Sequence, residues 1–374
     1  MRLHSYINAA VKILELHRPG KPLQHTLKQY FAFNKKHGSR DRKIISSLCY
    51  CYYRTGKNFT EDRHEKLVRS LYVCDPKSYA ATGDDKFMIE NDLNNRTREA
   101  GLDIIKIFPF ASFLSPRVHK LSFITSMLVQ PDLFLRLRPG REDFVTGILS
   151  GAGILFERTA DCTRLANSAT LPPEIRIDRD VVIQDMNSQR VFDNLPAPCE
   201  VAEIWDCCAA SGGKSILMFD KLQGNCKITA TDIRPSIISN LEERFQRAGL
   251  KDFSSKVLNS AEELPPGKFD LVICDVPCSG SGTWSRTPEQ LFHFPEPKAE
   301  EYASLQKRIA MNASHALKPG GHLVYITCSV FAKENEEVVE YLRQNTKLEL
   351  LGENYLPGYD DKADTLFAAV MTLP

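Results

Sequence analysis

From about residue 200 onward, short apolar runs alternate with longer segments whose apolar positions recur every three to four residues. The short runs are typical of buried strands and the longer segments of amphipathic helices. The predicted strands are EVAEIWDCC, KITATDI, SSKVLNS, FDLVICDV and HLVYITCSV, and the predicted helices are SILMFDKLQ, SIISNLEERFQRAGL and EEYASLQKRIAMNASHAL. This alternation predicts a doubly wound, mostly parallel α/β sheet. Two later runs, LELL and LFAAVMTL, are expected to add two last strands, the second of them antiparallel.

The first third of the chain has a helical pattern instead. Apolar residues recur at helical spacing after Ser5, which we expect to cap the first helix, and again along SRDRKIISSLCYCYYR. In this second helix Cys49 and Cys51 are expected to be small core residues. Residues 58 to about 125 show no clear pattern. The segments LFLRLR, REDFVTGILSGAG and ILFER then predict a small α/β unit over about 130–185.

These patterns predict three domains: a helical domain at 1–125, a small α/β subdomain at 126–195 and a Rossmann-like domain at 196–374. The net charge of the whole chain is only +1, but the residues up to Lys57 include twelve Lys and Arg against two acidic residues. Such a basic cluster suits a polyanion such as a nucleic acid. A solvated basic face without a ligand is the alternative.

The composition of the chain narrows its class. Its 374 residues, 43% hydrophobic and 25% charged, lie in the ordinary globular range. Apolar runs are shorter than the roughly 18 residues that a membrane span needs, and the N-terminus lacks the features of a signal peptide. We therefore expect a cytoplasmic protein that does not contact a membrane. Its eleven cysteines are expected to be free thiols, and their spacing, without paired CxxC motifs and neighbouring histidines, predicts no metal site.

Small residues follow the first predicted strand. Ligands of an open α/β sheet bind beyond the carboxyl ends of its strands, and the run DCCAASGGKS, from Asp206 to Ser215, would let a loop backbone approach a ligand there. A triphosphate-binding loop needs glycine where Cys208 stands, and the dinucleotide motif GxGxxG is absent. Asp232, at the end of the second strand, is suited to hold ribose hydroxyls. Together these features favour an adenosine-type ligand.

One carboxylate and two thiols are expected at the same edge of the sheet. Asp275 and Cys278 follow the fourth strand, in CDVPCSGSGTW, and Cys328 ends the fifth. Each one alone is most simply a turn or core residue, but the fold would bring all three to one crevice. A thiolate that attacks C6 of a pyrimidine makes C5 able to accept a methyl group. An acid near N3 relieves the charge that builds up on the ring. The residues by themselves do not rank the two thiols.

The segments DCCAASGGKS, ATDI, DVPCSGSGT and YITCS resemble, in this order, the motifs of the RsmB/NOP family of RNA (cytosine-5) methyltransferases. QDMNSQ and RTPE are similar to segments near these motifs in that family, and the resemblance covers about residues 130–374. It implies methylation of cytosine C5 in RNA through a covalent cysteine–C6 adduct, with S-adenosyl-L-methionine as the methyl donor. It makes Cys328 the attacking nucleophile, Cys278 the residue that aids product release and Asp275 the acid near N3. The residues that it implies as contacts of S-adenosylmethionine are Cys208, Ala209, Ala210, Ser211, Gly212, Gly213, Lys214, Asp232, Asn259 and Asp275.

The chain departs from the family pattern at two cofactor positions. Ser211 stands where the family loop has proline, and Asn259 stands where it has aspartate. The segments LRLRP, at 135–139, and ADTLFAA also differ from the family. These departures keep open a hypothesis of another class, an RNA-binding ribosome-assembly factor with weak catalysis. Intact Asp275, Cys278 and Cys328 favour the enzyme.

The expected substrate is ribosomal RNA, because the basic helical region is similar to the NusB-like domain of bacterial members that modify small-subunit ribosomal RNA. C5 methylation of transfer RNA is the alternative, and DNA or another pyrimidine position is disfavoured by the cysteine of TCS. The sequence does not specify the target cytosine, the protein partners or the oligomeric state.

Overall fold

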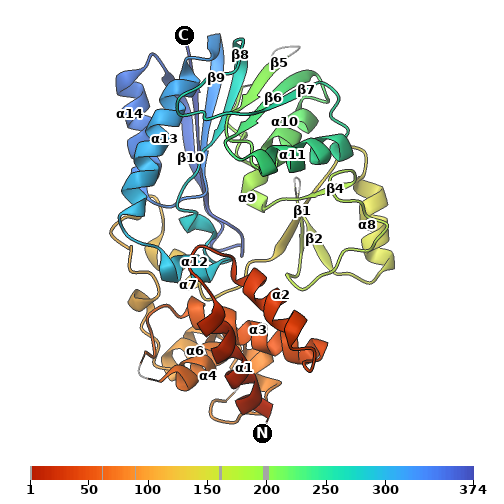
Figure 1. Cartoon of the computed structure of the whole chain (residues 1–374), viewed down its shortest axis with the longest axis vertical. Helices are drawn as coiled ribbons and strands as arrows, with labels where there is room; N and C mark the ends of the chain where they lie inside the picture. Colours follow the sequence, from red (N-terminus) through yellow and green to blue (C-terminus); the bar gives the residue numbers. More distant parts are fainter. Residues whose placement is uncertain (1, 61, 89, 160–161, 197–201) are drawn as a thin grey trace. The chain divides into compact units, whose positions relative to one another are not determined.

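The computed structural model describes residues 2–60, 62–88, 90–159, 162–196 and 202–374 (Figure 1). The chain divides into two compact units. The first comprises Met1–Ser112, His119–Gln130 and Thr283–Glu296, and the second comprises the remaining segments. In the part of the chain that the structure describes, no helix is long and apolar enough to cross a membrane. The three-domain division of the sequence stays a prediction.

The first unit is helical, as the N-terminal pattern predicted. Its helices are α1 (Arg2–Leu16), α2 (Leu23–Phe33), α3 (Ser39–Arg54), α4 (Arg63–Cys74), α5 (Pro76–Ala80), α6 (Leu93–Glu99), the 3₁₀ helix η1 (Ile104–Lys106), α7 (Lys120–Ser126) and α12 (Pro288–His293). Cys49 and Cys51 are buried in α3, which confirms them as core residues. The N-cap prediction was wrong, because α1 begins at Arg2 and Ser5 lies inside the helix.

Aspartates begin several helices in the stretch where the sequence showed no clear pattern. The side chains of Asp62, Asp75 and Asp92 accept backbone N–H groups at the starts of α4, α5 and α6, as N-cap residues do. Helices α5 and α6 have only five and seven residues, so their apolar positions give little periodic signal.

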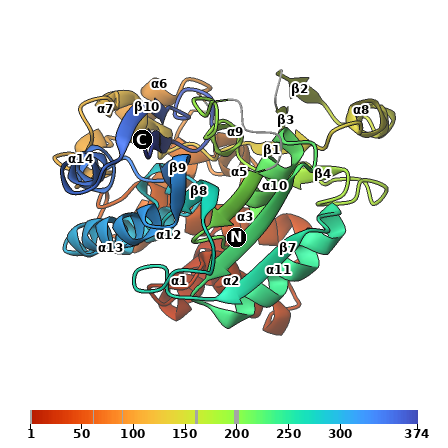
Figure 2. The same ribbon diagram turned by 90° about the horizontal axis from the view of Figure 1, so that it is seen from above.

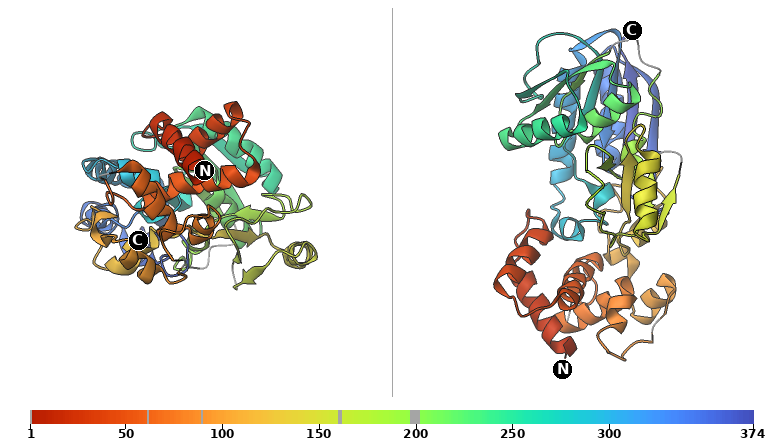
Figure 3. Two further views of the ribbon diagram at one scale, coloured as in Figure 1. Left: turned by 90° about the horizontal axis from the view of Figure 1, so that it is seen from below. Right: turned by 90° about the vertical axis from the view of Figure 1, so that its right-hand side faces the viewer.

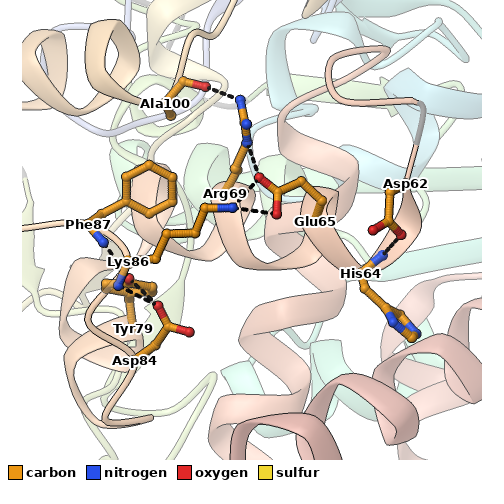
Figure 4. A network of polar contacts seen from close by, with 9 residues as sticks. All are labelled: Asp62, His64, Glu65, Arg69, Tyr79, Asp84, Lys86, Phe87 and Ala100. Atoms are coloured by element: carbon orange, nitrogen blue, oxygen red, sulfur yellow. Dashed lines mark hydrogen bonds and ion pairs between the residues drawn. The ribbon is translucent and has the colours of Figure 1, made fainter.

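A polar network centred on Glu65 ties α4 to the loop after α5 (Figure 4). The Glu65 carboxylate accepts Arg69 Nε at 2.5 Å and Lys86 Nζ at 2.5 and 2.6 Å. Tyr79 fixes the same loop, because its hydroxyl donates to Asp84 and accepts the N–H of Phe87. These contacts give the loop after α5 a defined conformation although it has no regular secondary structure.

Helix α12 comes from a distant part of the chain but packs with the N-terminal helices. The carboxylate of Glu289 accepts the backbone N–H of Leu23 at 3.0 Å, at the start of α2. The ring of Phe292 packs against that of Tyr53 on α3, with centroids 5.3 Å apart. The first unit is therefore completed by residues that follow the Cys278 loop in the sequence.

The second unit contains a small antiparallel sheet and a larger one. The small sheet has the order β2-β3-β1-β4, formed by β1 (Leu133–Leu137), β2 (Phe156–Arg158), β3 (Thr163–Leu165) and β4 (Val181–Ile183). Helix α8 (Glu142–Gly151), yellow in Figure 3, packs Val145 and Leu149 against Leu135 and Val181 of this sheet. The short helix α9 (Met186–Gln189) follows β4.

The larger sheet has seven strands in the order β10-β11-β9-β8-β5-β6-β7. Its parallel strands are β5 (Ala202–Asp206), β6 (Cys226–Asp232), β7 (Phe253–Val257), β8 (Phe269–Asp275) and β9 (Leu317–Thr327). All five were predicted, although residues 200 and 201 of the first predicted strand lie outside the described residues. The last two strands, β10 (Glu349–Leu356) and β11 (Leu366–Thr372), pair antiparallel with each other, and β11 pairs antiparallel with β9.

Helices cover both faces of this sheet. Alternate residues of each strand point to opposite faces, so Ile204 joins one core and Trp205 the other. Helices α10 (Gly213–Lys221) and α11 (Pro235–Ala248) pack on the Ile204 face, and α13 (Lys298–Ser314) and α14 (Glu336–Asn345) on the Trp205 face (Figures 1 and 2). The predicted Rossmann-like α/β fold is confirmed.

Candidate active site

The carboxyl ends of the parallel strands surround a cavity of about 370 Å³. Seven of the residues singled out in the sequence line it: Cys208, Ala210, Asp232, Asn259, Asp275, Cys278 and Cys328. They follow or end β5, β6, β7, β8 and β9, so the doubly wound topology brings them together from distant parts of the chain. Ala209, Ser211, Gly212, Gly213 and Lys214, also predicted, lie in the adjoining loop and helix and do not line the cavity.

The loop between β5 and α10 turns sharply at small residues. Ala210 and Gly212 have positive φ angles of 45° and 77°. A Cβ atom on Gly212 would lie 2.4 Å from Cε1 of Phe245, so only glycine fits at this position. The turn brings the backbone around Ala210 to the cavity wall before α10 begins at Gly213.

An arginine from α11 fixes this loop at Ser211. Arg244 Nη1 donates to the carbonyl oxygen of Ser211 at 3.0 Å and to its hydroxyl at 2.9 Å. Arg244 Nε in turn donates to Asp178 at 2.7 Å, and the Asp178 carboxylate is 3% exposed. Serine therefore gains an anchoring contact at the position where the family pattern has proline.

Asp232 is held by the arginine two positions later. Its oxygens accept Arg234 Nε at 2.8 Å and Nη2 at 2.9 Å, and the N–H of Ala210 at 3.2 Å. Burial alone would raise the pKa of the Asp232 carboxyl, but these hydrogen bonds hold the pKa below its usual value. An ionised acceptor therefore lies at the cavity wall, with the half-exposed Arg234 beside it.

The wall near Asn259 is partly apolar. Ile233, directly after β6, and Leu258, directly after β7, line the cavity. The Asn259 side-chain oxygen accepts the N–H of Ala261 at 3.2 Å, which fixes the orientation of the amide group.

Lys214 and Asp275 form an ion pair, with Nζ and Oδ2 2.6 Å apart. Burial alone would lower the pKa of Lys214, but the Asp275 carboxylate beside it raises this pKa above its ordinary value. Cys328 also raises the pKa of Lys214 by electrostatic interaction, so the ammonium group of Lys214 lies near the Cys328 side chain. The sequence did not predict this pairing.

The two thiols meet across the ends of β8 and β9. Cys278 Sγ and Cys328 Sγ are 3.3 Å apart. The hydrogen bond with Cys328 and burial together raise the pKa of the Cys278 thiol well above its ordinary value. Cys278 is therefore held as a neutral thiol next to Cys328.

Two buried carboxyl groups near the thiols and the loop were not singled out as site residues. Asp206, at the end of β5, accepts the hydroxyl of Ser215 at 2.6 Å, and burial raises its pKa to about 7. Glu334, in the 3₁₀ helix η3 (Ala332–Glu334), is 0% exposed and lies between the two cysteine loops. In the sequence Glu334 belongs to the charged run KENEE, which has the appearance of a surface segment. Within the described ranges, no group of three or more His, Cys, Asp and Glu side chains is arranged to hold a metal ion.

Strand order, helices on both faces and a cavity at the strand ends define a Rossmann-like α/β domain. Residues 194–364 match the family model of the 16S rRNA methyltransferases RsmB/F. This match, over slightly less than half of the chain, confirms the resemblance found in the sequence.

Curated relatives match over a similar length of the chain. Ribosomal RNA small subunit methyltransferase B of Xanthomonas campestris is 30% identical over 171 residues, 45% of this chain and 39% of the relative. Ribosomal RNA small subunit methyltransferase F of Cronobacter sakazakii is 32% identical over 167 residues, 42% of this chain and 34% of the relative. The chain thus spans less than two fifths of the length of either relative.

Solved structures share the fold over a larger part of the chain. The crystal structure of PH0851 has a TM-score of 0.74 at 17% identity and covers 99% of this chain and 98% of that one. NSun6 from Pyrococcus horikoshii, solved with SFG, has a TM-score of 0.62 at 16% identity and covers 71% and 97%. A methyltransferase homologue from Pyrococcus horikoshii has a TM-score of 0.59 at 22% identity and covers 71% and 93%.

Proposed function

We propose that this protein transfers a methyl group from S-adenosylmethionine to C5 of a cytosine in RNA, and that ribosomal RNA is its substrate. The observation that carries the proposal is the meeting of Cys278, Cys328 and Asp275 at one cavity. Two thiols and a carboxyl group at a ligand cavity suit nucleophilic catalysis on a pyrimidine ring. The compartment that we expect for this activity is the cytoplasm.

The residues around the cavity fit S-adenosylmethionine. The volume of about 370 Å³ lies in the range of small-molecule sites. Asp232 offers an ionised acceptor for ribose hydroxyls, Ile233 and Leu258 offer apolar surface for adenine, and Asn259 offers an amide for its polar edge. When bound, this cofactor supplies an electrophilic methyl group that C5 of the ring accepts.

Cys328 is the nucleophile in this proposal. Its thiolate forms a bond to C6, and the electrons of the C5–C6 double bond become available at C5. We assign Asp275 to N3 of the ring, where negative charge accumulates, and the ammonium group of Lys214, 2.6 Å from the Asp275 carboxylate, stabilises that charge. The neutral Cys278 thiol supports this order, because it can donate a hydrogen bond to the Cys328 thiolate.

Release of the product requires the proton on C5 to leave. We assign this step to Cys278: the bond of Cys328 to C6 removes the hydrogen bond that keeps Cys278 neutral, Cys278 loses its proton to solvent, and its thiolate takes the proton from C5. The electrons of the C5–H bond then restore the C5–C6 double bond, and Cys328 leaves C6 as a thiolate. The target base must present C6 to the thiolate, so it is either in single-stranded RNA or flipped out of a helix.

The test uses ribosomal RNA and, in a separate reaction, transfer RNA from a strain that lacks the gene, each incubated with the purified protein and S-adenosylmethionine. Nucleosides from the digested RNA are then analysed by mass spectrometry, and bisulfite sequencing maps the site. We expect new 5-methylcytidine at a defined position. Methylation of another nucleoside, or of transfer RNA alone, would refute the corresponding part of the proposal.

The ion pair between Asp232 and Arg234 favours a second candidate, an RNA-binding assembly factor with weak catalysis. In this structure the guanidinium occupies the carboxylate that ribose hydroxyls would use. Calorimetry with S-adenosylmethionine separates the two candidates, since only the enzyme requires binding at cellular cofactor concentrations.

A further inference from the structure

We propose that Glu334 is a positioning residue that holds the two cysteine loops in register and so sets the approach of Cys278 to Cys328. The catalytic meaning of this role rests on the proposed function, whereas the geometry does not. Glu334 follows β9 in η3, and its side chain is fully buried.

Each carboxylate oxygen of Glu334 contacts the loop of a different cysteine. Oε2 accepts the backbone N–H of Ser279, directly after Cys278, at 2.8 Å. Oε1 accepts the hydroxyl of Ser329, directly after Cys328, at 2.7 Å. One rigid carboxylate therefore bridges two loops that start from neighbouring strands.

Gln306 of α13 secures the Cys278 loop from its other side. Its Nε2 donates both to Glu334 Oε2 and to the carbonyl oxygen of Pro277, each at 2.9 Å. Tyr325 supports the pair, because its hydroxyl donates to the Glu334 carbonyl oxygen at 2.6 Å. The residues before and after Cys278 are thus both tied to one buried cluster.

Asn335, the next residue, secures the Cys328 loop in the same way. Its Nδ2 donates to the carbonyl oxygen of Ser329 at 2.9 Å, and its Oδ1 accepts the hydroxyl of Thr327 at 2.5 Å. The residues on both sides of Cys328 are therefore fixed by Glu334 and Asn335, which are both 0% exposed.

The carboxylate is costly to bury, since its partners are neutral donors and no ion pair to it occurs among the described residues. Burial raises the pKa of Glu334, while the hydrogen bonds of Ser279, Ser329 and Gln306 oppose that rise. An acceptor-only group at this position suits donors that converge from two loops. The arrangement is explained by the placement of the loops rather than by stability.

The test measures the approach of the two thiols without RNA or cofactor. Dibromobimane becomes fluorescent when it alkylates two neighbouring thiols, and the signal of a Cys278→Ala variant gives the background from other cysteines. In Glu334→Ala we expect cross-linking to slow by about tenfold, since small displacements strongly reduce the effective concentration of paired groups. Glu334→Gln should stay within about threefold of the parent, because an amide oxygen can accept from Ser279 and Gln306 while its NH₂ donates to the Ser329 oxygen.

The matched control is Glu340→Gln on α14, whose contacts are with the exposed Arg343 and Gln344. It should cross-link at the parent rate. If Glu334→Ala does not fold, Ser329→Ala replaces it. This change cuts the link from Glu334 to the Cys328 loop, together with the contacts of the Ser329 hydroxyl with Ser279, Ser281 and the N–H of Phe331, and we expect slowing by about threefold. Cross-linking at the rate of the Glu340→Gln control in the folded variant would overturn the proposal.

Methyl transfer is the second readout. In Glu334→Ala we expect kcat to fall by about 100-fold with KM for S-adenosylmethionine unchanged, and Glu334→Gln to restore most of kcat. A rise in KM with kcat unchanged would contradict the positioning role. If the parent protein methylates no RNA, the proposed function fails, while the cross-linking result still decides the role of Glu334.

Discussion

The sulfur atoms of Cys278 and Cys328 lie 3.3 Å apart, although fifty positions separate the two residues in the chain. They follow β8 and β9, which pair in parallel, so their carboxyl ends meet at one edge of the sheet. Two thiols this close together can act, one after the other, on two neighbouring atoms of the same substrate ring.

The first prediction separates the roles of the two thiols. Cys328→Ala should abolish methyl transfer and form no covalent complex, because the bond to C6 requires its thiolate. Cys278→Ala should let a protein–RNA adduct accumulate, because the adduct forms but is released slowly. Denaturing gels with labelled RNA and S-adenosylmethionine measure both outcomes.

The double variant is the control for these gels and should show no adduct. Near-normal turnover by Cys328→Ala would refute its assignment as the nucleophile. Continued product formation by Cys278→Ala without any adduct would refute the release role.

The second prediction concerns the loop at Ser211. Arg244→Met removes both hydrogen bonds to Ser211. We expect it to weaken the binding of S-adenosylmethionine about fivefold, equivalent to about 1 kcal/mol, the usual net value of one hydrogen bond. Isothermal titration calorimetry measures the affinity.

Arg247→Met is the matched control. Arg247 also pairs with Asp178, at 3.2 Å, and is half-exposed, but no hydrogen bond joins it to Ser211 in the described structure. Its affinity should equal that of the parent protein. Equal losses in both variants would assign the effect to Asp178 rather than to the loop.

The sequence predicts the parts of the site that depend on local patterns. Apolar runs identify β6 and β8, and the acids that follow them, Asp232 and Asp275, therefore fall at one edge of the sheet by topology alone. The sequence does not predict the partners of these acids. Lys214 pairs with Asp275 across 61 positions, and such pairing has no signature in a single sequence.

The sequence does not predict the burial of Glu334 and Glu289 for a related reason. Both lie in short polar segments, and charged residues are mostly exposed. Their burial depends on partners far away in the chain, Ser279 for Glu334 and Leu23 for Glu289. The six residues of α12 are also too few for a periodic pattern to reveal which core they join.

The third prediction tests this contribution of α12 to the helical unit. Glu289→Ala should lower the free energy of unfolding by about 1–3 kcal/mol, because the buried N–H of Leu23 loses its acceptor. Urea denaturation followed by circular dichroism measures the change. Glu296→Ala, an exposed position of the same segment, is the control and should have no measurable effect. Equal stability of the two variants would contradict a structural role for the Glu289 contact.

The last prediction concerns pH and Asp206. Burial raises the pKa of this carboxyl from 3.8 to about 7 in the folded protein. Between these two values the folded chain keeps a proton that the unfolded chain releases, so the contribution of Asp206 to stability is complete below about pH 4 and is lost as pH rises toward 7.

Asp206→Asn removes the ionisation while the side-chain shape is kept. The free energy of unfolding of this variant should therefore fall less between pH 5 and pH 8 than that of the parent. The gain in stability over the parent should be largest at pH 8. Urea titrations at pH 5, 6, 7 and 8 measure it, and Glu203→Gln on the same strand, half-exposed, controls for a general charge effect. Parallel pH curves for the parent and Asp206→Asn would show that Asp206 ionises at the same pH in both states of the chain.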